Sequence, residues 1–252
     1  MIRGIHNVGI VVKRLTDSYG FYRDTLRLPL VKEADLPDQG VRAALLSAGD
    51  SEIELLEPTT PDTGVARFLE RRGEGLHHVC FETPEIDADL ADLQERGVAV
   101  VDRQPRPGLA GRIAFLHPKA CDGVLVELAT PPRRGGGVEA PSPLRLKRLV
   151  IGARDPGATT AKLQSMFGFS DLMVNGGLRS MLAVGRGALL IVSDDEVGGT
   201  EGLVALSLVV DDFAGLRHAF ERAGVKALLG TGEVTVDPAS SHGVHLHISR
   251  FE

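Results

Sequence analysis

The chain has 252 residues, of which 43% are apolar, and carries a net charge of −6 from 28 basic and 34 acidic side chains. This apolar content is enough to build buried cores and excludes a disordered chain. No basic block is longer than a pair such as Arg133 and Arg134, which argues against a nucleic-acid-binding surface as a main function. Aromatic residues make up 4% of the chain and Trp is absent, which argues against base-stacking platforms.

The ends and the cysteines indicate the cellular compartment. The first six residues lack the apolar region of a secretion signal, and no run of 18 apolar residues occurs. Cys80 and Cys121 are too few for a disulfide framework. We therefore expect a cytoplasmic protein that neither crosses nor binds a membrane.

A strand followed by a helix occurs four times along the chain. The expected strands cover residues 5–12, 76–83, 146–153 and 203–210, and the expected helices cover 16–27, 85–96, 156–167 and 212–223. The helices show the i, i+3/4, i+7 spacing of apolar residues, and Gly97, Gly168 and Gly224 stand where helices commonly end. About three short strand-like runs follow each helix, such as 42–46 and 52–57. The sequence therefore predicts an α+β fold of four βαβββ units.

One segment has the composition of a linker. Residues 130–143 are rich in Gly and Pro, which prevents a packed element. We expect two domains of two units each, covering residues 1–131 and 144–252, with a linker at 132–143. Each unit covers one face of its sheet with a helix, so pairing two open faces would create a cleft.

Polar residues stand at equivalent places on the open faces of the first two units. Because side chains alternate along a strand, the first strands contribute Asn7 and His78, and the last strands contribute Glu54 and Glu127. The offsets agree, since 71 residues separate the first pair and 73 the second. An amide, an imidazole and two carboxylates in one cleft suit a divalent metal ion. The competing interpretation is a hydrogen-bonded structural histidine and solvated glutamates, and periodicity alone leaves both open.

A set of motifs between residues 4 and 130 adds a resemblance. They are Val8-Gly9-Ile10-Val11-Val12, Phe21-Tyr22-Arg23-Asp24-Thr25-Leu26, Gln39-Gly40-Val41, Glu52-Ile53-Glu54-Leu55-Leu56-Glu57-Pro58, Gly73-Glu74-Gly75-Leu76-His77-His78, Pro105-Arg106-Pro107-Gly108, Phe115-Leu116-His117-Pro118-Lys119 and Gly123-Val124-Leu125-Val126-Glu127-Leu128. In order and spacing this half resembles the methylmalonyl-CoA epimerases of the vicinal-oxygen-chelate (glyoxalase) superfamily. The resemblance implies two glyoxalase-like domains and a divalent ion in the cleft.

The metal positions that the resemblance implies are Asn7, Glu54, His78 and Glu127. The first position is normally histidine, and His6 does not simply replace it because adjacent strand residues point to opposite faces. Three oxygen donors and one nitrogen form a harder site that favours cobalt, manganese or magnesium, and zinc also stays open. Such a site should bind its ion more weakly than the usual one.

The resemblance also implies the chemistry. Epimerisation needs one group that removes the proton α to the thioester and another that returns it from the opposite face. Glu127 is a candidate for one of them, while the position of the partner carboxylate corresponds to Ala43. Glu52, or Gln39 acting with water, are open alternatives for the second role.

Three basic residues in the loops around the second unit would suit the phosphates of coenzyme A, or would form an ordinary charged loop. They are Arg106, Arg112 and Lys119. With Gln39 they complete the expected substrate-binding set. The expected ligand is therefore a small acyl-CoA, and the resemblance leaves room for a homodimer.

The C-terminal half has the repeat without the site. The positions equivalent to Asn7, Glu54, His78 and Glu127 are Arg148, Leu190, Ala205 and His247. One potential ligand of four cannot hold a metal ion. His242 and His245 could line a pocket with His247, although structural histidines fit the pattern better. We expect a degenerate copy of the first domain.

Three functions follow from these observations. The first is an isomerase that epimerises methylmalonyl-CoA or a similar acyl-CoA through an enediolate. The second is a glyoxalase-like lyase acting on a thiol adduct, or an epimerase of another acyl-CoA. The third is a non-catalytic small-molecule-binding protein, favoured by the changes at Asn7 and Ala43 and disfavoured by retention of the other three ligands.

Overall fold

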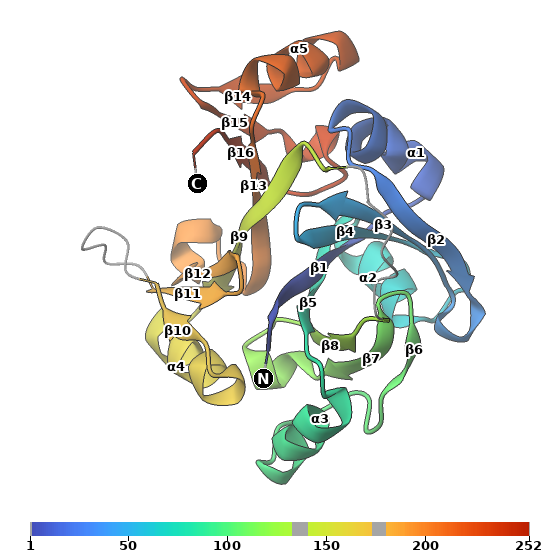
Figure 1. The fold of residues 1–252 in the computed structure, drawn as a ribbon, viewed down its shortest axis with the longest axis vertical. Coiled ribbons are helices and arrows are strands. Elements are labelled where there is room, and N and C mark those ends of the chain that lie inside the picture. Colours follow the sequence, from blue (N-terminus) through green and yellow to red (C-terminus); the bar gives the residue numbers. More distant parts are fainter. Residues whose placement is uncertain (1, 133–140, 173–179, 252) are drawn as a thin grey trace. The chain divides into compact units, whose positions relative to one another are not determined.

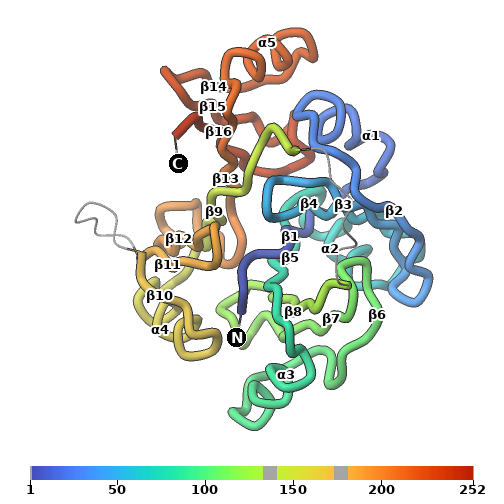
Figure 2. Tube along the Cα trace, in the orientation of Figure 1, coloured from blue at the N-terminus to red at the C-terminus, as the bar shows by residue number. Residues whose placement is uncertain are grey.

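The computed structural model describes residues 2–132, 141–172 and 180–251 (Figures 1 and 2). Its strands form two eight-stranded sheets, one built from residues 4–130 and the other from residues 144–249. Among the described residues no helix is both long enough and apolar enough to cross a membrane.

The first half contains two βαβββ units. Their elements are β1 (Gly4–Val11), α1 (Leu15–Tyr19), η1 (Gly20–Thr25), β2 (Leu30–Leu36), η2 (Pro37–Gln39), β3 (Val41–Ala48), β4 (Ser51–Pro58), α2 (Gly64–Arg72), β5 (Gly75–Glu82), α3 (Ile86–Glu95), β6 (Arg106–Gly108), β7 (Gly111–Leu116), η3 (Pro118–Cys121) and β8 (Val126–Thr130). Helix α2 lies between the two units.

The second half repeats the pattern. Its elements are β9 (Leu144–Ala153), α4 (Pro156–Phe167), β10 (Ser170–Asp171), β11 (Ser180–Val184), β12 (Gly187–Ser193), η4 (Asp194–Val197), β13 (Gly202–Val210), α5 (Phe213–Ala223), β14 (Ala227–Leu229), β15 (Glu233–Val236), η5 (Pro238–Ser240) and β16 (Leu246–Ser249). The strand order is β2-β3-β4-β1-β5-β8-β7-β6 in the first sheet and β10-β11-β12-β9-β13-β16-β15-β14 in the second. The same order in both sheets confirms the α+β fold of four βαβββ units.

The expected helices are present with small differences. The predicted helix at 16–27 is the α-helix α1 followed by the π-helical segment η1, in which the Thr25 hydroxyl donates to the carbonyl of Gly20 at 2.7 Å. A π turn has i→i+5 hydrogen bonds, and the apolar spacing read as one continuous helix did not predict it. Gly97, Gly168 and Gly224 all have positive φ, as their places after helices predicted.

Helix α2 was not predicted. Its N-terminus is capped by the Thr63 side chain, which accepts from the backbone N–H of Ala66 at 3.1 Å. A threonine ahead of an apolar-periodic segment was the signal available in the sequence.

The described residues group into two compact units. The first contains residues 1–7, 78–137 and 148–204, and the second contains residues 8–77, 138–147 and 205–252. Each unit therefore combines residues from both halves of the chain, although each sheet takes its strands from one half. Residues 133–140 of the predicted linker lie outside the described residues.

In the first compact unit, which contains residues 78–132 and 148–172, helix α4 lies against the η3 turn. The Asp122 carboxylate accepts from the Thr159 hydroxyl at 2.8 Å and from the Lys162 ammonium. The Phe81 ring packs edge-on against Phe167 and Phe169, with centroids 5.3 and 5.1 Å away. An apolar contact and a charged contact thus join the two halves within this unit.

In the second compact unit, which contains residues 8–77 and 205–251, helix α5 lies against η1. The rings of Phe21 and Phe220 are 6.3 Å apart, and the buried Tyr22 hydroxyl donates to the carbonyl of Ser241 at 2.8 Å. Burial raises the pKa of Tyr22 far above that of a free phenol, so this hydroxyl stays protonated and donating at any physiological pH.

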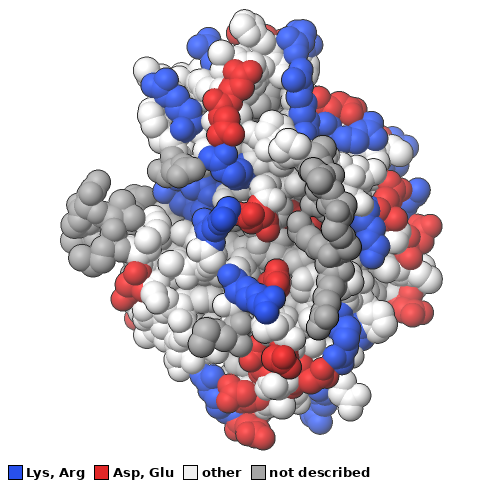
Figure 3. Space-filling view, in the orientation of Figure 1, with Lys and Arg blue, Asp and Glu red and all other residues white. Residues whose placement is uncertain are grey.

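The surface matches the composition. On the face drawn in Figure 3, basic and acidic side chains are interspersed, and no block of one sign dominates.

Candidate metal centre

A histidine and a glutamate lie side by side on neighbouring strands of the first sheet. Strands β5 and β8 are parallel, with Cys80 opposite Glu127, so that His78 and Glu127 lie on the same face. The Nε2 atom of His78 is 3.3 Å from Oε2 of Glu127, and both side chains are almost fully buried. The sequence predicted that these two side chains share the open face, and their register places them on one face.

Phe115 fixes the imidazole from the next strand. It lies opposite Glu127 in the antiparallel β7–β8 pair, and its ring meets the His78 ring edge-on with centroids 5.4 Å apart. Edge-to-face contacts of this kind add to the energy of burial and define the orientation of both rings.

Glu54, on β4, completes a group of three. Glu54, His78 and Glu127 are all buried, and each offers one ligand atom within 4.8 Å of the others. It is the one such group found among the described His, Cys, Asp and Glu residues.

The group fits a divalent cation. Burying two carboxylates together is costly unless a positive charge compensates them. The buried Oε2 of Glu127 has no hydrogen-bond partner among the described residues, although His78 Nε2 is close by. Two carboxylate oxygens and one imidazole nitrogen are ligands that first-row divalent ions accept. The site can therefore hold such an ion, whose identity the donor set does not fix.

Asn7 is fully buried in β1. Its Oδ1 atom accepts from Nδ1 of His6 at 2.8 Å, and His6 is itself 8% exposed. The two neighbouring side chains are thus hydrogen-bonded to each other, an arrangement that the alternation of strand side chains did not predict. Whether Asn7 ligates an ion stays a prediction.

Strands β3 and β4 place the alternatives for a second base. In their antiparallel register Ala43 lies opposite Leu56, and Glu54 lies opposite Leu45. Glu52 therefore shares a face with Glu54, two residues away along β4, and is 5% exposed. Gln39 ends the short η2 helix, outside these strands.

The three basic residues predicted to bind phosphate differ in their surroundings. Arg112 and Asp87 form a two-pronged ion pair on the surface, in which the hydrogen bond raises the pKa of Arg112 and lowers that of Asp87. Lys119 is exposed in η3. Arg106 is half-buried in β6, and its Nη1 atom is buried with no hydrogen-bond partner among the described residues.

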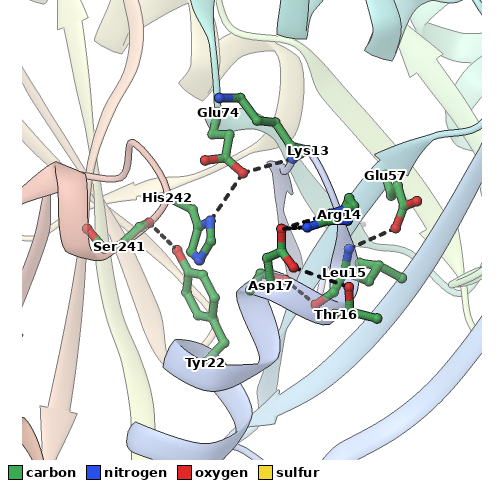
Figure 4. Close-up of polar contacts among 11 residues, drawn as sticks. Lys13, Arg14, Leu15, Thr16, Asp17, Tyr22, Glu57, Glu74, Ser241 and His242 are labelled. Atoms are coloured by element: carbon green, nitrogen blue, oxygen red, sulfur yellow. Dashed lines mark hydrogen bonds and ion pairs between the residues drawn. The ribbon is translucent and has the colours of Figure 1, made fainter. Parts of the chain in front are cut away.

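Two carboxylates, those of Glu74 and Glu57, accept hydrogen bonds from backbone N–H groups that follow β1. Figure 4 shows the Glu74 carboxylate between the backbone N–H of Lys13, 2.8 Å away, and Nδ1 of His242, 3.1 Å away. Glu57 accepts from the backbone N–H of Leu15 at 2.8 Å. Glu57 lies on the strand that carries Glu54, so this contact fixes the end of β4.

The C-terminal histidines have structural surroundings. His242 has a φ of 54° and precedes Gly243, where a Cβ atom would stand 1.9 Å from the carbonyl oxygen of Glu74. His247 pairs with Glu233 at 3.2 Å, and His245 is exposed. His242 and His247 each pair with a carboxylate, whereas the Nδ1 atom of His247 is buried without a hydrogen-bond partner among the described residues. The preference for structural histidines over a pocket stays a prediction.

The equivalent positions of the second sheet also follow from register. Ser207 lies opposite His247 in β13–β16, as Cys80 lies opposite Glu127 in β5–β8. Ala205 therefore stands where His78 stands in the first sheet, and Leu190 lies opposite Met181 as Glu54 lies opposite Leu45. Two of the three ligand positions carry aliphatic side chains.

Comparison with known proteins places the N-terminal half in a family. The sequence profile of the Glyoxalase/Bleomycin resistance protein/Dioxygenase superfamily matches residues 6–115. The ethylmalonyl-CoA/methylmalonyl-CoA epimerase of Cereibacter sphaeroides is 37% identical over 131 residues, which is 51% of this chain and 98% of that protein.

Solved structures extend the comparison. A methylmalonyl-CoA epimerase variant from Streptomyces coelicolor, in complex with 2-nitronate-propionyl-CoA, is 41% identical with a TM-score of 0.51, and the match covers 52% of this chain and 99% of that one. A 4-hydroxymandelate synthase mutant from Streptomyces coelicolor is 16% identical with a TM-score of 0.75 and covers 98% of this chain and 92% of its own, which shows a shared fold for both halves.

The chain belongs to the glyoxalase/bleomycin resistance protein/dioxygenase superfamily, with two glyoxalase-like sheets, and its N-terminal half is homologous to isomerases of the methylmalonyl-CoA epimerase type.

Proposed function

We propose that the protein is a metal-dependent epimerase of methylmalonyl-CoA or a closely similar acyl-CoA. The observation that carries this proposal is the buried group Glu54, His78 and Glu127, in the half of the chain that is homologous to epimerases. A substrate with a carboxylate and a thioester on one carbon suits such a group, because two oxygen atoms can approach one cation.

Glu54, His78 and Glu127 would hold the ion, with the Asn7 amide oxygen as a fourth donor. When bound, a divalent cation supplies positive charge where the enediolate develops. A bound ion would also compensate the two buried carboxylates, whose burial is otherwise costly.

The chain itself supplies the proton transfers. Glu127 is the proposed base for one face of the α-carbon, since its buried Oε2 atom has no competing hydrogen bond among the described residues. Glu52 is the proposed second base, because it is buried on the same face of β4 as Glu54. Ala43 offers no acidic group at the position where the resemblance implies one.

Solvent-hydrogen exchange tests this function. Metal-loaded protein and methylmalonyl-CoA in deuterated water should give deuterium at the carbon between carboxylate and thioester, because the returning proton comes from solvent-exchanged groups. Absence of exchange, with a small molecule bound at the group, would replace this proposal with a binding protein. Cleavage of a thiol adduct in place of exchange would replace it with a lyase.

We also propose that residues 1–131 and 144–252 are the two domains, with 132–143 as the linker. The support is that each sheet draws its strands from one of these ranges. Residues 1–131 expressed alone should unfold cooperatively in denaturant. A non-cooperative transition would favour the compact units that combine both halves.

A further inference from the structure

Arg106 is held in place by a carboxylate and an aromatic ring. Its Nε atom donates to Oδ1 of Asp102 at 3.1 Å, and its guanidinium carbon lies 5.7 Å from the centre of the Phe115 ring. The other Asp102 oxygen accepts from the backbone N–H of Phe115 at 2.9 Å. Asp102 thus ties the arginine to the strand that carries Phe115, which limits the motion of the guanidinium.

The same arginine has a buried N–H donor that is not hydrogen-bonded to any described residue. Its Nη1 atom is buried and has no hydrogen-bond partner among the described residues, whereas the side chain as a whole is 36% exposed. A buried guanidinium N–H without an acceptor is costly, so an acceptor is expected in the functional state. An anionic oxygen is the best acceptor for a guanidinium group.

The register places Arg106 on the face that carries the metal ligands. Arg106 lies opposite Ile113 in β6–β7, and Phe115, two residues further, lies opposite Glu127 in β7–β8. The Phe115 ring contacts both the Arg106 guanidinium and the His78 ring.

Apolar side chains accompany these charged groups. Cys80, Ala110, Ile113 and Ala129 form a buried cluster against which Phe115 packs. This face therefore combines an anion-binding donor, metal-ligating groups and an apolar patch. A malonyl thioester with a small alkyl substituent presents the matching set of groups on one carbon.

We infer that Arg106 binds the free carboxylate of the acyl group and so selects malonyl-type thioesters over simple acyl thioesters. This inference rests on the proposed function. The carboxylate is favoured over the phosphates of coenzyme A because Arg106 is two ring contacts from His78, whereas the phosphates lie at the far end of the pantetheine arm. Arg96, whose guanidinium pairs with Asp92 at 3.1 Å on the surface at the C-terminal end of α3, serves as the matched control.

Binding of two thioesters tests the inference. Methylmalonyl-CoA and propionyl-CoA differ by the carboxylate alone, and their dissociation constants can be measured calorimetrically on the metal-loaded full chain. Arg106→Met keeps an unbranched stem on Phe115 and removes the charge. It should weaken methylmalonyl-CoA binding by about tenfold or more, as expected for a hydrogen bond to a charged group, and leave propionyl-CoA within about twofold.

The controls separate the possible failures. Arg96→Met should change neither constant, and Arg106→Lys should recover part of the loss if charge is what matters. An equal loss for both thioesters in Arg106→Met would assign the arginine to the coenzyme A moiety, and no loss for either would make it structural. Both results overturn the inference while leaving the proposed function in place. Failure of the wild type to bind methylmalonyl-CoA would instead overturn the proposed function, and the inference with it.

Discussion

The two sheets of this protein share a strand order and differ in what their equivalent strands carry. In the first sheet, β4, β5 and β8 bring Glu54, His78 and Glu127 together. In the second sheet the equivalent positions are Leu190, Ala205 and His247, and His247 is paired with Glu233. One scaffold therefore carries a buried pair of carboxylates in the first sheet and no carboxylate at the equivalent positions of the second.

The comparison shows what the fold requires and what chemistry requires. Burying a carboxylate costs folding free energy unless a cation or a hydrogen bond compensates its charge. A sheet that binds no cation is therefore more stable with uncharged side chains at these positions. The aliphatic residues of the second sheet are the default for such positions. The C-terminal half instead contributes contacts, since Ser241 accepts from Tyr22 and His242 pairs with Glu74 within one unit.

The largest expected effect is the loss of deuterium exchange when Glu127, whose equivalent in the second sheet is not acidic, is replaced. Glu127→Gln should reduce deuterium exchange into methylmalonyl-CoA by about 100-fold or more, because it removes a base and weakens a metal ligand together. The matched change His247→Gln should leave exchange within about twofold. Equal losses in the two variants, measured by mass spectrometry of the thioester, would contradict the assignment of chemistry to the first sheet.

A smaller effect is expected where the halves meet within the second unit. Tyr22→Phe leaves the buried carbonyl of Ser241 without its donor, which should lower the free energy of unfolding by about 2 kcal/mol. Urea denaturation measures the change. Metal affinity should stay the same, and a parallel loss of metal binding would mean that this contact also supports the ligands.

The fourth donor position sharpens the comparison further. Asn7→His should raise the affinity for manganese or cobalt by about tenfold, or 1.4 kcal/mol, since imidazole is a stronger donor than an amide oxygen to most first-row ions. Isothermal titration gives the affinity. The equivalent Arg148→His should create no binding in a Glu127→Gln background, and an unchanged affinity in Asn7→His would remove Asn7 from the site.

The smallest effect concerns a thiol of the first half. Burial raises the pKa of Cys121 to about 12, so the folded chain keeps the thiol neutral where an unfolded thiol ionises. The unfolded state then binds fewer protons above the ordinary thiol pKa, and stability falls as the pH rises beyond it. Between pH 8 and pH 10 the loss should be about 1 kcal/mol, and Cys121→Ala should remove it. Urea titrations of both proteins at the two pH values give their free energies of unfolding. An equal loss of unfolding free energy in the wild type and in Cys121→Ala would show that Cys121 is not the group responsible.

Much of the fold was predictable because the repeat is regular. The near-equal offsets between Asn7 and His78 and between Glu54 and Glu127 indicate a duplicated unit, and the strand order of the first sheet is symmetric about its centre. The missed helix α2 lies between the repeats, where no periodic expectation applied. The alternation of apolar residues in strands and their helical spacing were sufficient wherever the same βαβββ pattern was repeated along the chain.

The site was less predictable where it depends on distant contacts. Arg106 and Arg112 look alike in the sequence, and only the neighbouring Asp102 and Asp87 side chains show that one is held with a free donor and the other is occupied. The pairing of His242 with Glu74 joins residues 168 positions apart, which no spacing rule indicates. The hydrogen bond between His6 and Asn7 likewise depends on side-chain rotation, which strand alternation does not specify.

The central claim is that the first sheet holds an ion and the second does not. The most direct measurement is the stoichiometry of manganese binding, obtained by calorimetric titration of the full chain after removal of bound metal with a chelator. The account predicts one ion per chain in the wild type and in His247→Ala, and none in Glu54→Ala or His78→Ala at the same metal concentrations. Two ions per chain, no ion in the wild type, or loss of the ion in His247→Ala would contradict it.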